Sequence, residues 1–169
     1  IRTKFKNTRK DITITEENIE DFLGLEYEDA NVWYVLSLLQ GVHNPAVQYH
    51  KDHLYPKNIF IRPQEGSDKL LRFEETMQSA FPNPEDRAFA EDRKNWNTLP
   101  NLQLLEGSQN ESKGDTPLAE WAKRTGKSAV SFYVPANTNL DLANFKPFIE
   151  ARRDAIRLKL LAILKPEAS

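Results

Sequence analysis

The chain has 169 residues, of which 39% are hydrophobic and 28% charged, and this size and composition suit one compact soluble domain rather than a disordered protein. Cysteine is absent, which excludes disulfides and thiolate zinc sites and fits a cytoplasmic protein. The net charge of -2 excludes a positive field over the whole molecule that would attract nucleic acid. We find no apolar run of membrane-spanning length and no signal-peptide pattern.

The first ten residues, IRTKFKNTRK, are basic and contain no acid. The chain begins with Ile1 rather than Met, so we expect a piece of a longer protein. We interpret residues 1–10 as a solvated linker from a missing upstream domain, in preference to an arm that grips DNA. Residues 11–169 are then expected to form a single domain.

Two helices are predicted after this linker. In TITEENIEDFLGL (13–25), Thr15 is a suitable N-cap, acids fill the first turn, and Gly24 stands where a helix commonly ends. ANVWYVLSLLQGV (30–42) is apolar on nearly all sides, which predicts a buried core helix. YHKDHLYPKNIF (49–60) is aromatic or β-branched at both ends, which favours a strand and a turn.

Helices and one strand are predicted for the middle of the chain. The helical segments are KLLRFEETMQSAF (69–81), EDRAFAEDRKNWN (85–97), one that begins in SQNESKGD (108–115), and TPLAEWAKRTGK (116–127). Ser108 and Glu111 have capping-box spacing, and Thr116 is a possible N-cap before Pro117. LPNLQLL (99–105) has the length and apolar character of a short strand.

The chain closes with an irregular segment, 128–144, and an amphipathic helix, 145–164. One face of this helix carries apolar residues at steps of three, four and seven, which indicates core packing: Phe145, Ile149, Ile156, Leu160 and Ile163. The three tryptophans lie in predicted helices and are better interpreted as core than as platforms for stacked bases: Trp33, Trp96 and Trp121.

Two segments contain residues that could form one catalytic site. HKDHLYPKN (50–58) and LPNLQLLEGSQNESK (99–113) supply Asp52, His53, Lys57, Asn101, Asn110 and Lys113. Carboxylate and amide oxygens suit Mg²⁺ or Mn²⁺. Histidine titrates near neutral pH and can take a proton from water, while lysine supplies a point charge for phosphate.

The local geometry limits how these residues can meet. Asp52 and His53 point to opposite faces of a regular strand, so a shared site requires the chain to bulge or leave the strand, which Pro56 makes plausible. Asn110 and Lys113 share a face of a helix opened by Ser108. Asn110 would lie in its first turn, where a phosphate is favoured.

A DH pair followed by proline, then NLQLL, then N-x-x-K resembles the HNH (ββα-metal) nuclease family. HKDHLYPKN, LPNLQLLEGSQNESKGDTPLAEW and NFKPFIEARRDAIRLKLLAIL resemble, in this order, the C-terminal nuclease domain of GmrSD-type restriction endonucleases, whose relatives include the SspE type. The resemblance covers the chain from about Ile12 onward. In the family the two motif segments usually lie closer together than they do here.

The resemblance implies an α+β, mostly helical fold. Its ββα-metal core would come from about 48–60 and 99–114, with a helical insertion at 68–97, surrounding helices and a long amphipathic C-terminal helix. The residue-by-residue implication is that Asp52 and Asn110 bind Mg²⁺ (or Mn²⁺), that His53 is the general base, and that Asn101 orients His53. Lys57, Lys113 and His50 would contact substrate, although a hydrogen bond from His50 to backbone fits equally well.

The implied function is a metal-dependent DNA endonuclease that nicks DNA, within a modification-dependent, anti-phage restriction protein of the bacterial cytoplasm. The implied partners are DNA and an N-terminal nucleotide-hydrolysing sensor domain of the same polypeptide, without a membrane. Two alternatives stay open: an inactive ββα module that binds DNA or its partner domain, and a protein-interaction domain that works through its terminal helix. The sequence specifies neither the DNA modification nor the oligomeric state.

Overall fold

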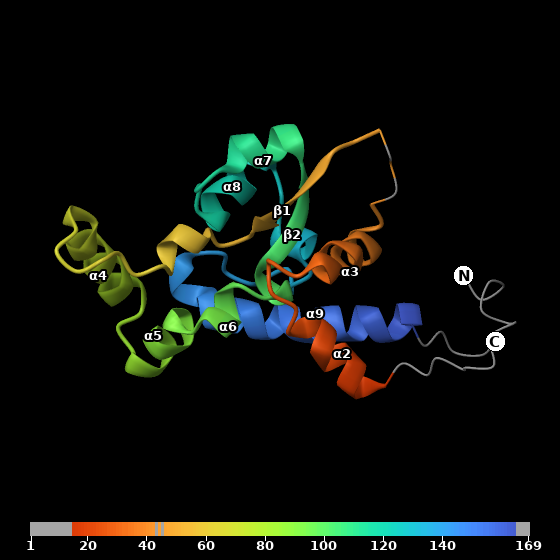
Figure 1. Ribbon diagram of the computed structural model, residues 1–169, viewed down its shortest axis with the longest axis horizontal. Coiled ribbons are helices and arrows are strands. Elements are labelled where there is room, and N and C mark those ends of the chain that lie inside the picture. Colours follow the sequence, from red (N-terminus) through yellow and green to blue (C-terminus); the bar gives the residue numbers. More distant parts are fainter. Residues whose placement is uncertain (1–14, 43, 45, 165–169) are drawn as a thin grey trace, which may run out of the picture.

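A computed structural model describes residues 15–42, 44 and 46–164, so the basic stretch at the start of the chain lies outside the described residues (Figure 1). The protein is α+β and mostly helical, as expected, with one small antiparallel sheet in the described part. None of the helices described there combines the length and the apolar character that crossing a bilayer requires.

The elements follow one another with short connections. The helices are α2 (Glu16–Leu23), α3 (Ala30–Gln40), α4 (Asp68–Ala80), α5 (Pro84–Glu91), α6 (Arg93–Trp96), α7 (Gly107–Lys113), α8 (Leu118–Thr125) and α9 (Phe145–Leu164). The strands are β1 (Tyr49–His53) and β2 (Leu102–Glu106). Short 3-10 turns are η1 (Lys57–Ile59), η2 (Leu99–Asn101), η3 (Ala129–Phe132) and η4 (Leu142–Asn144).

The sheet pairs the two segments that the sequence singled out. β1 runs antiparallel to β2, with Asp52 opposite Gln103 and His53 opposite Leu102. Helix α7 follows β2 without a loop and packs against both strands (Figure 1). Helices α4 to α6 are inserted between the two strands, and Figure 1 shows α4 and α5 projecting away from the sheet. The insertion therefore does not interrupt the pairing of β1 with β2.

Two apolar clusters form the core, and α9 contributes to both. Phe145, Phe148 and Ile149, in its first half, pack with residues of α4, α6 and α8. Ile156 and Leu160, in its second half, pack with α2, α3 and β2. Figure 1 shows α9 running below the sheet, α7 and α8 along much of the length of the molecule, so this one long helix reaches both clusters.

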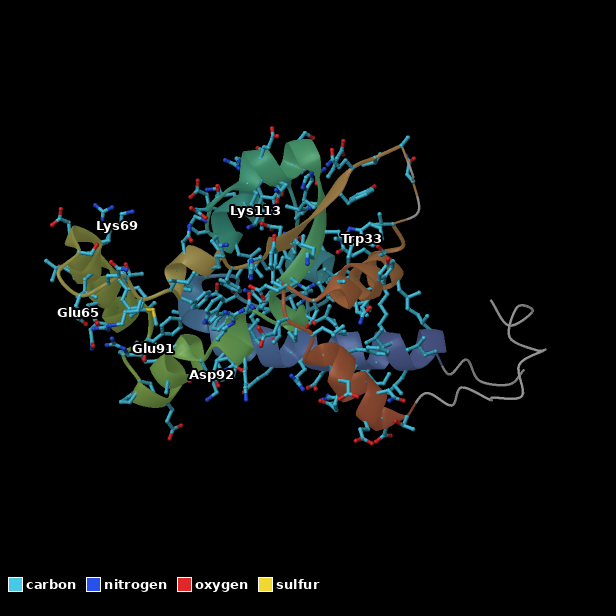
Figure 2. The ribbon with its side chains drawn as sticks, in the orientation of Figure 1. Trp33, Glu65, Lys69, Glu91, Asp92 and Lys113 are labelled. Atoms are coloured by element: carbon cyan, nitrogen blue, oxygen red, sulfur yellow. The ribbon has the colours of Figure 1, made fainter. Side chains whose placement is uncertain are left out.

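The sequence overestimated burial in two helices. Trp33 and Tyr34 of α3 are 37% and 68% exposed, because this nearly all-apolar helix packs through one face only (Figure 2). The prediction that Trp33 is a core residue is therefore wrong, whereas Trp96 and Trp121 are buried as expected. Ile163 in the last turn of α9 is 36% exposed, so the buried stripe ends at Leu160.

Several helix boundaries differ from those predicted. The segment 85–97 is two helices, because Asp92 is extended (ψ 116°) and its carboxylate caps α6 by accepting from Lys94 N at 3.0 Å. Helix α7 begins at Gly107, ahead of the predicted cap Ser108. Pro117, rather than Thr116, precedes α8. Thr15 caps α2 as predicted, with Asn18 completing the capping box.

Candidate active site

A pocket of about 220 Å³ lies where β1 ends, bordered by the chain around α7 and by the loop after α2. It is lined by Tyr27, Lys51, Asp52, His53, Pro56, Lys57, Asn110, Gly114 and Asp115. Four residues singled out from the sequence therefore border one pocket: Asp52, His53, Lys57 and Asn110. The other three, His50, Asn101 and Lys113, lie around it in positions described below.

Asp52 and His53 reach this pocket by the second of the two arrangements that the sequence allowed, in which the chain leaves the strand rather than bulging. Both belong to the regular ladder of β1, opposite Gln103 and Leu102. His53 is the last residue of the strand, and the chain leaves the ladder immediately after it. The end of the strand thus brings two adjacent side chains to one pocket.

The carboxylate of Asp52 is held from two sides. Gln103 Nε2 donates to its Oδ2 at 2.8 Å, and Lys113 Nζ lies 3.1 Å from the same oxygen. The Asp52 side chain is only 13% exposed, and this burial raises its pKa, while the charge of Lys113 is the largest opposing effect. Asp52 is therefore a desolvated carboxylate whose ionised form is favoured by its lysine partner.

Lys113 is buried, so its ammonium is not open to a substrate. Besides its ion pair with Asp52, its ammonium donates to the backbone oxygen of His53 at 2.7 Å. The sequence suggested a contact with phosphate. In the structure this ammonium instead contacts the end of β1, and it thereby links α7 to the strand that carries Asp52 and His53.

The imidazole of His53 is buried between two aromatic rings. It stacks on Tyr27 with 4.8 Å between ring centroids, and Trp96 lies 6.3 Å away. Its Nε2 is 3.1 Å from Oδ1 of Asn97. Burial lowers the pKa of His53 to about 4, the hydrogen bond to Asn97 opposes this, and Lys57 and Lys113 add to the lowering. The ring is therefore neutral near neutral pH, which is the state that can accept a proton.

Asn101 acts on the backbone next to His53 rather than on its ring. Its amide nitrogen donates to Tyr55 O at 3.0 Å and to Trp96 O at 2.8 Å, and its Oδ1 accepts from Tyr55 N. Both amide hydrogens are thus used by backbone carbonyls. The contact with the imidazole that the sequence assigned to Asn101 belongs to Asn97, which sequence reasoning missed because no local pattern marks it.

The remaining predicted residues occupy different positions. Asn110 is half-buried in α7 and Lys57 is exposed at the start of η1, both at the pocket. His50 lies outside the lining; its ring rests against Gly107, where an added Cβ would be 3.4 Å from His50 Nε2. Asp115, which sequence reasoning also missed, lines the pocket and accepts from Asn58 Nδ2 at 2.8 Å.

The oxygen donors of the pocket fit a hard divalent ion. Among the described residues there is no group of three or more His, Cys, Asp or Glu side chains that could hold a metal. Mg²⁺ does not require such a group, because it commonly keeps several waters and uses one or two carboxylates. The oxygen-bearing side chains that line the pocket include Asp52, Asn110 and Asp115. A carboxylate offers about four lone-pair sites, so the contacts from Gln103 and Lys113 leave part of the Asp52 carboxylate able to bind an ion.

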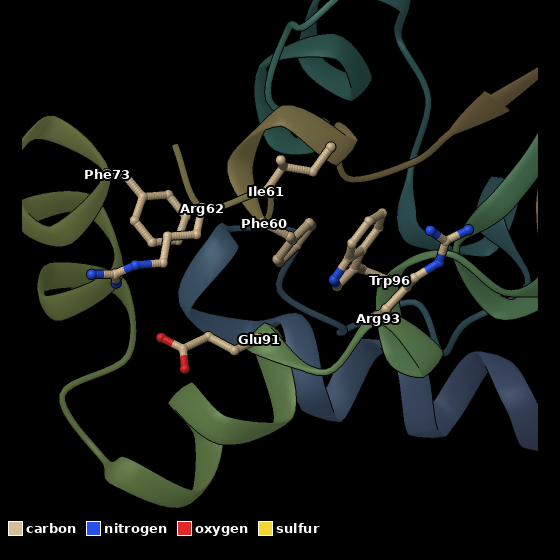
Figure 3. A pocket seen from close by; sticks show the side chains of 7 residues that line it. All are labelled: Phe60, Ile61, Arg62, Phe73, Glu91, Arg93 and Trp96. Atoms are coloured by element: carbon tan, nitrogen blue, oxygen red, sulfur yellow. The ribbon is translucent and has the colours of Figure 1, made fainter. Parts of the chain in front are cut away.

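A larger pocket, of about 490 Å³, lies beside the insertion (Figure 3). Its lining is Phe60, Ile61, Arg62, Phe73, Glu91, Arg93 and Trp96. Both arginines are already ion-paired, Arg62 with two glutamates and Arg93 with two others. The larger pocket contains no histidine, and its one carboxylate, Glu91, is paired with Arg87. The smaller pocket is therefore the better candidate for an active site.

No protein-family model matches the chain, and no curated protein matches it.

Proposed function

We propose that this protein is a metal-dependent DNA endonuclease domain with an HNH (ββα-metal) core, and that the pocket at the end of β1 is its active site. The observation that carries the proposal is the pairing, at one pocket, of a neutral buried imidazole, His53, with an adjacent carboxylate, Asp52. The antiparallel strands β1 and β2 followed directly by α7 support the ββα assignment.

Each residue has a role in this proposal. His53 takes a proton from the attacking water, and its neutral state leaves it free to do so. Asp52 and Asn110 would hold Mg²⁺ or Mn²⁺, which when bound supplies charge stabilisation at the scissile phosphate. Lys57, exposed at the rim, offers a positive charge to the DNA backbone. Lys113 favours the ionised form of Asp52 and binds the backbone at the end of β1.

The wider setting of the proposal follows from the family resemblance. The domain would act within a modification-dependent restriction protein that defends bacteria against phage. A nucleotide-hydrolysing sensor domain on the same polypeptide would select the DNA, and this domain would nick it. Because the net charge of this chain is only -2, we expect much of the DNA affinity to come from other parts of that protein.

The decisive experiment is nicking of supercoiled plasmid in Mg²⁺ or Mn²⁺. We expect the wild-type chain to nick and His53→Ala to lose the roughly 10²–10⁴-fold that a general base supplies. His53→Gln is included because its larger side chain preserves more of the packing against Tyr27. Leu158→Ala, at an exposed position of α9, is the control and should nick like the wild type. Wild-type rates in His53→Ala would contradict the assignment.

The second candidate is an inactive ββα module that binds DNA or a partner domain. One observation favours it: the carboxylate of Asp52 is already neutralised by buried Lys113, an arrangement that a purely structural ion pair would also show. DNA binding that weakens with salt, without nicking in either metal, would identify this function.

A further inference from the structure

The side chain of Asn97 lies between His53 and two glutamates. It is buried, and its Oδ1 is 3.1 Å from His53 Nε2. Its Nδ2 donates to Glu28 Oε2 at 2.8 Å and to Glu26 Oε2 at 3.3 Å. The two ends of one amide group thus face two chemically different neighbours, an imidazole and a pair of carboxylates.

The carboxylates determine which way the amide points. An ionised carboxylate only accepts hydrogen bonds, so the NH₂ end of Asn97 must face Glu26 and Glu28. The opposite end, Oδ1, then faces the imidazole and can only accept. His53 Nε2 must therefore carry the hydrogen, which leaves the lone pair of the neutral ring on Nδ1. The hydrogen bond that the structure gives this ring is the one at Nε2.

The glutamates are themselves fixed in place. Arg93 pairs with Glu26 at 3.0 Å and with Glu28 at 2.9 Å. Arg93 begins α6 and Asn97 follows its last residue, so one short helix carries both the amide and the cation that anchors the carboxylates. An isolated β-bridge between Glu26 and Thr98 joins the two backbones at the same place.

The ring plane of His53 is fixed as well. Tyr27 stacks on one side with an angle of 18° between the rings, and Trp96 lies on a second side. A half-turn of the imidazole about its Cβ–Cγ bond would place Cε1 where Nε2 now lies and would therefore break the hydrogen bond to Asn97.

We propose that Asn97, oriented by Glu26 and Glu28, is a positioning residue that holds His53 as the Nε2–H tautomer and leaves Nδ1 as the proton-accepting atom. The tautomer itself follows from the hydrogen bonds and does not depend on nuclease activity. Its importance for catalysis rests on the proposed function.

The tautomer can be measured directly by NMR of the histidine ring nitrogens in ¹⁵N-labelled protein near neutral pH. The chain has 3 histidines, so His53→Gln assigns the relevant signals by their loss. We expect Nε2 of His53 to resonate as a protonated nitrogen and Nδ1 as an unprotonated one. A protonated Nδ1 in the wild type would overturn the proposal.

Matched variants test the role of the network. In the isosteric double variant Glu26→Gln/Glu28→Gln, the new amides can donate as well as accept, so Asn97 no longer has one preferred orientation. We expect the two ¹⁵N shifts of His53 to move toward each other, and Asn97→Ala to produce the same change. Glu20→Gln, an ion-paired surface glutamate elsewhere, and Asn95→Ala, whose side chain bonds Phe89 O, are controls that should leave them in place. Unchanged shifts in the double variant would refute the orienting role of the glutamates.

Plasmid nicking by the same variants separates the two proposals. We expect Asn97→Ala to lower kcat with little change in KM, because the amide lies behind the imidazole and away from DNA. A wild-type protein that shows the expected tautomer but does not nick would overturn the nuclease function alone. A nicking wild type with the opposite tautomer would overturn only the role of Asn97.

Discussion

At the scale of single residues, the site combines groups whose charge states are set by burial. His53 is desolvated between Tyr27 and Trp96, which favours its neutral form. Asp52 is also desolvated, but Lys113 lies beside it and favours its ionised form. The same pocket therefore holds a neutral imidazole next to a carboxylate with a cationic partner, and the proposed metal-assisted hydrolysis rests on this pair.

The lowered pKa of His53 predicts how stability depends on pH. An unfolded histidine takes up its proton near pH 6.5, whereas the native ring does so at about 4. Between these values the unfolded state binds more protons, so stability increases with pH there. The stability that the neutral buried ring contributes is complete above about pH 6.5 and is lost as the pH falls toward 4. Its size is about 3 kcal/mol, since each pKa unit corresponds to about 1.4 kcal/mol.

Urea unfolding of the wild type and of His53→Gln across this pH range measures the effect. The difference between their free energies of unfolding should shrink as the pH falls, because only the wild type has this group to protonate. Parallel pH curves for the two proteins would contradict the assignment of a buried neutral ring.

The sequence predicted which residues gather at the pocket better than it predicted what they contact. Local sequence motifs contain Asp52, His53 and Asn110. These residues meet at the pocket because β1, β2 and α7 pack against one another. The partner of His53, Asn97, belongs to the end of the insertion and is brought close only by tertiary packing. The burial of Lys113 is likewise a property of the folded chain that no spacing rule reveals.

At the scale of elements, the end of α7 shapes one wall of the pocket. Gly114 ends this helix with φ 46° and ψ −131°, a conformation that side chains with a Cβ strongly disfavour. It lines the pocket together with Asp115, so the turn it makes decides where that carboxylate lies. The start of α2 could be predicted from the sequence, because Thr15 caps it with its own side chain. The start of α7 could not, because no side chain caps that helix.

Two glycine-to-alanine variants test whether the backbone at Gly114 is strained for other residues. Gly114→Ala should lower the free energy of unfolding by about 1–3 kcal/mol, because alanine must adopt the disfavoured conformation even though space for its Cβ exists. Gly24 ends α2 with φ −84°, an ordinary helical value, so Gly24→Ala should be neutral or slightly stabilising. Denaturant titration followed by circular dichroism compares the two, and equal losses would exclude backbone strain at Gly114 as the cause.

At the scale of the whole molecule, α9 joins the two apolar clusters into one core. Its first half packs with helices of the insertion and with α8, and its second half packs with α2, α3 and β2. Buried Arg152, between the two halves, donates to Leu102 O and so ties α9 to the strand paired with His53. We therefore expect the domain to unfold as one unit.

Two leucines of α9 offer a matched test of this role. Leu160 is buried in the second cluster, and Leu160→Ala should cost about 2–5 kcal/mol. Leu158 is 68% exposed two residues earlier, and Leu158→Ala should stay within about 0.5 kcal/mol of the wild type. Thermal and urea unfolding give both values, and the buried variant should still show one transition. A split transition would indicate that the clusters fold independently.

The insertion between β1 and β2 has a consequence for any attempt to minimise the domain. A shortened chain that joined the strands directly would keep Asp52, His53 and Asn110, and by motif it would look complete. It would lose Trp96 and Asn97, which pack on and hydrogen-bond the imidazole. The support extends further, because Phe73 and Met77 of α4 and Ala90 of α5 share one buried cluster with Trp96. A shortened domain that keeps the site intact would therefore have to keep the whole insertion, α4 to α6.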